Sequence, residues 1–224
     1  MITYDPEKDS QPSHSVGDVV LSAKQIDSFV DKVIRTIHSI DPDFGNTLVI
    51  SIADGGIPFS SDVLSKLSRV YDVSNLTFIS VDYKKPYSEQ NPINAPVVDE
   101  KPLIEKFSYK VPGRSHKTGY KHIVILDDMA DSCSTILSVV KWLMLLGLLH
   151  SNKEKCFLNV FCPVASRDAE RFFTKYTQQF ALSATATLNY AATVHKVWLV
   201  GYGLDDIQGQ QRFRREIVVE TSLK

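Results

Sequence analysis

The sequence has few cysteines, no excess of charge of either sign and no long apolar run. Its three cysteines in 224 residues are too few and too scattered for a disulfide framework or a CxxC metal site, which favours a reducing, cytoplasmic environment. Lysine and arginine total 25 against 26 acidic residues, so there is no strong basic field to bind nucleic acid or an anionic membrane surface. The longest apolar stretch, around residues 136–149, is broken by Lys141 and Gly147, and the polar N-terminus lacks a signal-peptide pattern. We therefore expect a cytoplasmic protein without a membrane or nucleic-acid partner.

The length suits one domain, and a 43% apolar fraction with 23% charged residues is ordinary for a globular chain. Residues 1–20 are polar and contain two prolines, so we expect a poorly ordered lead-in followed by a single domain at 21–224. Residues 84–121 hold five of the ten prolines and show no period of 2 or 3.6. A segment of this kind in a compact domain is typically functional or disordered, and we predict a mobile loop, with a disordered insertion as the alternative.

Short apolar runs and helical spacings alternate along the rest of the chain. Strands are predicted over residues 47–52, 75–81, 122–126, 155–161 and 197–200. Helices are predicted from a Ser22 cap to Pro42, and over residues 58–70, 134–146 and 166–176. Because the strands read as continuous apolar runs between helices, the pattern favours an α/β fold with a central, mostly parallel sheet flanked by helices.

Residues 122–136, HIVILDDMADSCSTI, are the segment most indicative of chemistry. A buried strand presents Asp127 and Asp128 at its carboxyl end, and a loop of small and hydroxylic residues leads into a helix. Ligands of open α/β sheets bind at this edge, and the N–H groups of a helix N-terminus favour a phosphate. Paired carboxylates would repel that phosphate, but they accept hydrogen bonds from a sugar diol and tolerate a divalent cation. The segment predicts a site for a phosphorylated ribose, and a plain capped helix N-terminus is the alternative.

Two stretches resemble known motifs. LDDMADSCST resembles the phosphoribosyl pyrophosphate (PRPP) motif of the type I phosphoribosyltransferases, and it is close to the corresponding loop of PRPP synthetases, which are longer and have two duplicated domains. KVWLVGYGLDD, at residues 196–206, is similar to the purine-site segment of the hypoxanthine-guanine phosphoribosyltransferases, and nearest to the divergent protozoan guanine type. The two motifs occur in the family's order, and the resemblance extends over residues 20–220.

The resemblance implies a type I phosphoribosyltransferase fold with a small hood. It also implies a purine-salvage reaction: the phosphoribosyl group of PRPP passes to a 6-oxopurine (guanine, hypoxanthine or xanthine), giving GMP, IMP or a related nucleotide and pyrophosphate, with Mg²⁺. By position, Asp127 and Asp128 take the ribose hydroxyls and Asp131 is the general base near purine N7. The implied 5′-phosphate loop consists of Asp131, Ser132, Cys133, Ser134 and Thr135.

The same resemblance assigns the base and the leaving group. Trp198 stacks on the purine, the backbone of Leu199 reads its edge, and Asp205 lies beside it and the pyrophosphate-side Mg²⁺. The implied pyrophosphate contacts are Asp54, Gly55 and Arg212. The implied metal-binding carboxylates are Asp205, Asp127 and Asp128. The family usually forms homodimers or homotetramers, and the loop at 84–121 is expected to close over the reacting centre and exclude water.

The sequence departs from the family's pattern in ways that bear on the choice of base. The family's lysine that bonds the purine 6-oxygen is absent after the strand at 155–161, so either Arg167 or Lys175 substitutes for it or the base preference differs. Cys133 stands where the family often has glycine, and a helix N-terminus can lower the pKa of a thiol. The alternatives are a phosphoribosyltransferase for another base and a PRPP-sensing regulator without catalysis.

Overall fold

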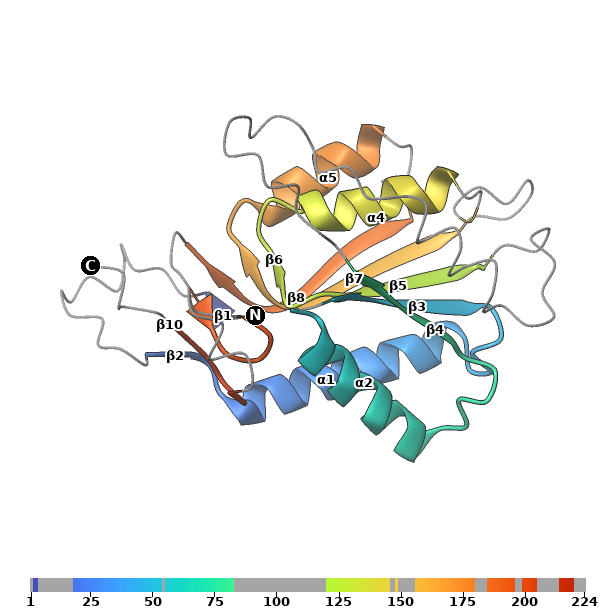
Figure 1. Ribbon diagram of the computed structural model, residues 1–224, viewed down its shortest axis with the longest axis horizontal. Helices are drawn as coiled ribbons and strands as arrows, with labels where there is room; N and C mark the ends of the chain where they lie inside the picture. Colours follow the sequence, from blue (N-terminus) through green and yellow to red (C-terminus); the bar gives the residue numbers. More distant parts are fainter. Residues whose placement is uncertain are drawn as a thin grey trace.

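In the computed structural model, a seven-stranded sheet forms the centre of the molecule, with helices on both faces (Figure 1). The structure describes residues 2–3, 18–53, 55–82, 120–145, 148, 156–179, 185–195, 199–204 and 214–219. Most of the loop predicted at 84–121 therefore lies outside the described residues.

The strands of the central sheet are parallel to one another. Their order across the sheet is β1 (Ile2–Thr3), β8 (Ala186–Val194), β7 (Phe157–Ser166), β5 (His122–Leu126), β3 (Thr47–Ala53) and β4 (Thr77–Asp82). A two-residue strand, β6 (Met129–Ala130), continues beside β7 beyond the end of β5. All of the pairings are parallel, which confirms the predicted class of fold.

Among the described elements, α1 (Ala23–Ile40) and α2 (Ile57–Val70) lie on one side of the sheet, and α4 (Ser134–Leu145) and α5 (Ala169–Gln179) lie on the other (Figure 1). Ser22 caps α1 as predicted, because its side chain accepts from the backbone N–H of Gln25 while the Gln25 side chain accepts from the N–H of Ser22. Two separate buried clusters result, one under each pair of helices.

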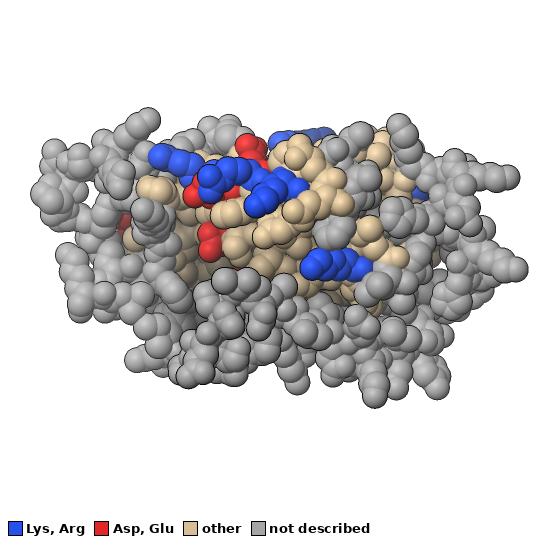
Figure 2. Space-filling model, turned by 90° about the horizontal axis from the view of Figure 1, so that it is seen from above, with Lys and Arg blue, Asp and Glu red and all other residues tan. Residues whose placement is uncertain are grey.

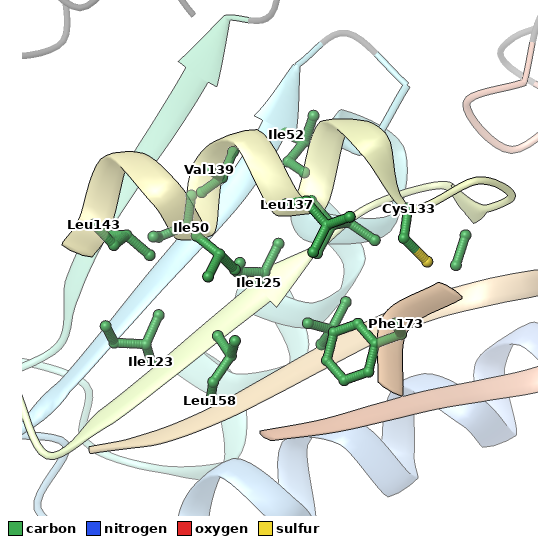
Figure 3. Packing of buried hydrophobic residues seen from close by; sticks show 14 of the residues in the cluster. Ile50, Ile52, Ile123, Ile125, Cys133, Leu137, Val139, Leu143, Leu158 and Phe173 are labelled. Carbon is green, nitrogen blue, oxygen red and sulfur yellow. The ribbon is translucent and has the colours of Figure 1, made fainter. Parts of the chain in front are cut away.

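The cluster under α4 supports the strand–loop–helix joint singled out in the sequence. Figure 3 shows Leu137 and Leu143 of α4 packed over Ile50 of β3 and Ile125 of β5, and all four are buried. Burying one such side chain contributes about 1.5–3 kcal/mol. The loop between β5 and α4 is therefore held between two well-packed elements.

A second, antiparallel sheet has three strands: β2 (Val19–Leu21), β10 (Ile217–Val219) and β9 (Leu199–Val200). β10 lies between the other two and pairs with both. This small sheet is the hood that the resemblance implied. Its strand β2, like β1 of the central sheet, comes from the segment at 1–20 that we expected to be a poorly ordered lead-in.

Several element boundaries differ from those predicted. β7 continues to Ser166 rather than ending at Phe161, so α5 begins at Ala169. Pro163 does not interrupt β7 because it falls where the pairing partner changes: Phe161 pairs with Leu126 of β5, and Val164 pairs with Met129 of β6. The strand predicted at 197–200 is described only as β9, and it belongs to the hood rather than to the central sheet.

The order of strands creates a switch point next to β3. The chain runs from β3 to its neighbour β4 and then returns to β5 on the other side of β3. In open α/β sheets, ligands bind outside the carboxyl ends of the strands at such a point. We therefore expect a ligand site at the turns that follow β3 and β5. No helix among the described residues is long and apolar enough to cross a membrane.

Candidate functional site

Three turns meet at the carboxyl ends of β3 and β5. They are the turn at residues 55–56 after β3, the pair Asp127 and Asp128 after β5, and the turn at residues 201–204 after β9. A Cβ atom on Gly55 would collide with the carboxylate of Asp128, and one on Gly203 would collide with the carbonyl oxygen of Gly55. Glycine is needed at both positions for this close approach. The segments that the resemblance linked to pyrophosphate, ribose and purine are thus brought into contact.

The two adjacent carboxylates have different environments. Asp127 is only 5% exposed, and one of its oxygens accepts the backbone N–H of Asp128 at 3.0 Å. Asp128 is half-buried and accepts the N–H of Met129 at 2.7 Å. Burial, and then the charge of Asp128, raises the pKa of Asp127 well above its ordinary value. Asp128 is consequently the more accessible of the two predicted ribose ligands.

The loop before α4 turns hydroxyl groups outward and a thiol inward. Ser134 and Thr135 are half-exposed and Ser132 is exposed. Cys133 has a positive φ of 57°, is 3% exposed and donates through Sγ to the carbonyl oxygen of Ala169 at 3.6 Å. Figure 3 shows its sulfur directed away from the helix, toward the side on which α5 lies. Only the backbone of Cys133 is therefore available to an anion in the loop.

The position of Cys133 at a helix N-terminus does not lower the pKa of its thiol. Burial, and then the charges of Asp127 and Asp131, raises the pKa of this thiol to about 12. In this packed apolar cluster, desolvation disfavours the thiolate more than the helix N-terminus stabilises it, so the pKa of the thiol rises. Cys133 is thus a packing residue and not a nucleophile.

A cavity of about 300 Å³ opens beside the loop. It lies between the loop, the junction of β7 with α5, and the end of β8. Its lining residues are Met129, Asp131, Ser166, Arg167, Asp168, Phe172, Val194 and His195. The loop is tied to the far wall, because Ser166 Oγ donates to the carbonyl oxygen of Asp131 at 3.1 Å. The cavity combines carboxylates, a guanidinium, an imidazole and an aromatic ring, a set suited to a polar heterocycle.

Other predicted residues fall outside this cavity or outside the described residues. Leu199 is buried in β9 and pairs with Val219 of β10, and it does not line the cavity. The predicted residues that the structure does not describe are Asp54, Trp198, Asp205 and Arg212. Within the described ranges, no group of three or more His, Cys, Asp or Glu side chains is placed to hold a metal ion.

Much of the cavity wall was not anticipated. Arg167 had been considered as a substitute for the missing lysine, but His195, Phe172 and Ser166 had not been identified. Their positions at the ends of strands could have identified them. Ser166 ends β7 and His195 directly follows β8, at the edge where ligands bind in such sheets. It was missed because β7 was predicted to end too early and β8 was not predicted.

The outer surface near the cavity carries both signs of charge. On the face seen in Figure 2, lysine and arginine side chains lie next to acidic ones. Among the described residues, Arg171 of α5 pairs with Asp168 in the turn before that helix, with 3.3 Å between Nη2 and Oδ1. The described part of this face is therefore not uniformly basic.

The fold is that of an α/β protein whose strand order places a switch point beside the loops after β3 and β5, the position at which ligands of such sheets bind. A family model described as "phosphoribosyl transferase domain" matches residues 22–147, more than half of the chain. The chain therefore belongs to the phosphoribosyltransferase family, whose members use PRPP with Mg²⁺. A search of curated protein sequences found no match to this chain.

Solved structures share the fold at low sequence identity. A hypoxanthine phosphoribosyltransferase from Staphylococcus aureus is 15% identical with a TM-score of 0.61, and the match covers 95% of this chain and 97% of that one. The hypoxanthine phosphoribosyltransferase from Trypanosoma cruzi, in complex with the product IMP, is 15% identical with a TM-score of 0.60, covering 95% and 98%. A hypoxanthine-guanine-xanthine phosphoribosyltransferase is 12% identical with a TM-score of 0.58, covering 94% and 100%. At these identities the likeness establishes the fold.

Proposed function

We propose that this phosphoribosyltransferase acts on a 6-oxopurine: guanine, hypoxanthine or xanthine. The observation that carries the proposal is the cavity beside the loop, whose lining residues include the acidic Asp131 and the basic Arg167. A 6-oxopurine carries an N–H that must lose its proton and a carbonyl oxygen that accepts a hydrogen bond. One acceptor and one strong donor across a cavity of about 300 Å³ suit such a bicyclic base.

The ribose and its phosphate would bind at the loop. The half-buried Asp128 accepts from the ribose hydroxyls, and the backbone N–H groups before α4, with the hydroxyls of Ser134 and Thr135, hold the 5′-phosphate. The backbone of the turn at Gly55 would contact the pyrophosphate, while the N–H of Gly56 donates to the carbonyl oxygen of Ile52 at 2.9 Å and holds the turn in place. The rigid packing of β5 and α4 on either side of the loop supports this proposal, since phosphate recognition needs fixed donors.

Mg²⁺ fits this site through Asp128 and through Asp127. Mg²⁺ prefers one or two carboxylates together with substrate oxygens, and adjacent carboxylates of which one is half-exposed are such a donor set. A cation beside the pair would also favour the ionised form of Asp127, whose pKa burial raises. When bound, Mg²⁺ neutralises charge on the departing pyrophosphate.

In the reaction that we propose, Asp131 takes the proton from purine N7 while N9 bonds to the anomeric carbon of ribose and the bond to pyrophosphate breaks. The electrons of that bond leave with pyrophosphate. Arg167 donates to the 6-oxygen, in the role of the lysine that the family has and this chain lacks. Lys175 is a weaker candidate because it is exposed on α5 and does not line the cavity.

The test is a panel of bases. The protein is incubated with PRPP, Mg²⁺ and each of guanine, hypoxanthine, xanthine, adenine, uracil and orotate, and pyrophosphate release is followed. We expect release with one or more of the 6-oxopurines and none with adenine, uracil or orotate. Turnover of a pyrimidine alone would replace the proposal with the same chemistry on another base. Tight PRPP binding without turnover of any base would point to a regulator.

Variants at Arg167 test whether this side chain is the hydrogen-bond donor to the purine 6-oxygen. Arg167→Gln should lower kcat/KM for the accepted base by about 10- to 100-fold, as expected for a lost hydrogen bond from a charged group. Arg167→Lys should recover part of that loss. The matched control is Arg171→Gln, which removes a guanidinium from α5 that pairs with Asp168 and does not line the cavity. Equal losses in the two Gln variants would remove Arg167 from its role.

A further inference from the structure

Tyr202 lies at the centre of the turn at residues 201–204 and is held from several directions. Its backbone N–H donates to the carbonyl oxygen of Arg214 at 2.8 Å, and its φ is +51°, a left-handed value that is unfavourable for a residue with a side chain. The turn is closed by a pair of hydrogen bonds between Gly201 and Leu204, of 2.8 and 3.1 Å. A strained conformation of this kind persists only where the surroundings hold it in place.

The side chain of Tyr202 connects the turn to α2. It is 5% exposed, and its hydroxyl donates to Oδ2 of Asp62 at 2.7 Å, across 140 residues of sequence. Its ring lies 6.3 Å from that of Phe59, centroid to centroid, at an angle of 59°. Burial, and then the bond to Asp62, raises the pKa of Tyr202, so the hydroxyl stays a donor at neutral pH. α2 is the helix that follows the turn at residues 55–56.

This connection brings Gly203 against the site. The backbone of Gly203 approaches the carbonyl oxygen of Gly55, and a Cβ on Gly203 would also come within 3.3 Å of Cβ of Asp128. The Asp128 side chain therefore has Gly55 on one side and Gly203 on another. Each of these residues belongs to a different segment of the chain, and each turn limits where the carboxyl group can go.

We propose that Tyr202 is a positioning residue, whose hydrogen bond to Asp62 clamps the turn at residues 201–204 onto the turn at residues 55–56 and thereby fixes the Asp128 carboxylate for PRPP. The inference rests on the proposed role of Asp128 in binding the ribose of PRPP. It predicts that the hood and the PRPP site are coupled. Loosening the turn should lower the affinity for PRPP, although Tyr202 itself touches no substrate.

The first measurement is PRPP affinity by calorimetry in the presence of Mg²⁺, without a base. Tyr202→Phe keeps the ring on Phe59 and deletes the hydroxyl, and we expect its Kd for PRPP to rise by about tenfold, the effect of losing a hydrogen bond to a charged group. Asp62→Ala should give the same rise. Asp62 is exposed, so this second variant is expected to fold even if Tyr202→Phe is unstable. Asp62→Asn keeps an acceptor and should restore most of the affinity.

The double variant shows whether the two residues act through one shared hydrogen bond or affect PRPP binding independently. Because both residues act through one bond, Tyr202→Phe combined with Asp62→Ala should bind PRPP no more weakly than either single variant. The matched control is Tyr190→Phe, which removes a tyrosine hydroxyl that likewise donates to a carboxylate, that of Glu170 on α5, at 2.6 Å. It should lower thermal stability to a similar extent and leave the Kd for PRPP within about twofold.

Amide hydrogen exchange tests the proposed clamp in the protein without any ligand. Tyr202→Phe and Asp62→Ala should raise exchange of the amides of residues 201–204 at least about tenfold, while the amides of α4 stay protected. Unchanged PRPP affinity and unchanged exchange in both variants would overturn the inference, as would an additive double variant or an equal loss of PRPP affinity in Tyr190→Phe. A native chain that binds no PRPP would instead overturn the proposed function, and faster exchange at 201–204 in the variants would then still support the clamp.

Discussion

The loop between β5 and α4 and the contact between residues 55–56 and 201–204 are two parts of one candidate site, built in opposite ways. The loop is a single stretch of sequence held between two elements that pack on each other. The contact joins segments almost 150 residues apart, and it depends on two glycines that allow backbones to touch. One part is specified locally and the other depends on the whole fold. Substitutions in the first should change chemistry, and substitutions in the second should change alignment.

The largest effect is expected from the loop itself. Asp131→Asn should lower kcat by about 100-fold or more, the usual contribution of a general base, while the Kd for PRPP changes by less than about threefold. Steady-state kinetics with the accepted base, together with calorimetry for PRPP, measures both. The control is Asp43→Asn, an exposed carboxylate at the opposite, amino end of β3. If Asp131→Asn kept its kcat, the proton acceptor would have to be sought elsewhere.

A pair of glycine variants probes the long-range contact. Gly203 and Gly201 both have positive φ, of 105° and 93°, so alanine at either should destabilise the fold by about 1–3 kcal/mol. A Cβ on Gly203 meets Gly55, whereas one on Gly201 meets the carbonyl oxygen of Glu216 inside the hood. Gly203→Ala should therefore also weaken PRPP binding by about tenfold, whereas Gly201→Ala, which strains the same turn without meeting Gly55, should weaken it less. Denaturant unfolding and calorimetry separate the two effects, and parallel losses of PRPP affinity would mean that the hood acts only as a whole.

Asp127 gives a pH-dependent effect on stability. Its pKa is raised in the folded protein, so the unfolded chain loses this proton first as pH rises above about 4. The contribution of the carboxyl to stability is thus present at acid pH and is lost between its ordinary and its raised pKa. Asp127→Asn should raise Tm at pH 7 without ligand by about 2–4 °C, the shift that 1 kcal/mol produces in a chain of this size, and the gain should vanish near pH 4. A Tm difference that is the same at both pH values would contradict the assigned burial.

The smallest effect is expected at Cys133, whose backbone in the loop is strained. Cys133 has a φ of +57°, a conformation that costs a residue with a side chain about 1–2 kcal/mol. Cys156, at the start of β7, is similarly buried but is not among the residues with positive φ. Cys133→Gly should therefore cost about 1 kcal/mol less stability than Cys156→Gly, as measured by urea unfolding. A larger loss at Cys133 would mean that its sulfur contact with Ala169 outweighs the strain.

The elements that sequence reasoning predicted well are those whose signals are local. Ser22 and the apolar spacing after it gave the start of α1 correctly, because a cap and an amphipathic face depend on residues within one turn. The run of residues 122–126 followed by two acids gave β5 and its loop for the same reason. The burial of the Cys133 side chain, in contrast, has no local signal, because it depends on a left-handed backbone that turns the thiol toward the core.

The elements that were missed have no such signal. The alternating polar residues of β8 carry little apolar contrast, and its place beside β7 is set by an eight-pair register that forms only when the sheet assembles. The cavity wall was missed for the same reason, since Ser166 and His195 line one cavity with Asp131 only when β7 and β8 end side by side.

The order of residues alone determined the α/β class, the parallel sheet and the composition of the loop after β5, because each follows from periodicity and spacing over a few neighbouring residues. Only the tertiary structure decided which acid of the pair stays accessible, which side chains enclose the cavity and which glycines touch. These properties depend on desolvation and close packing between distant segments, and neither force acts until the segments are assembled.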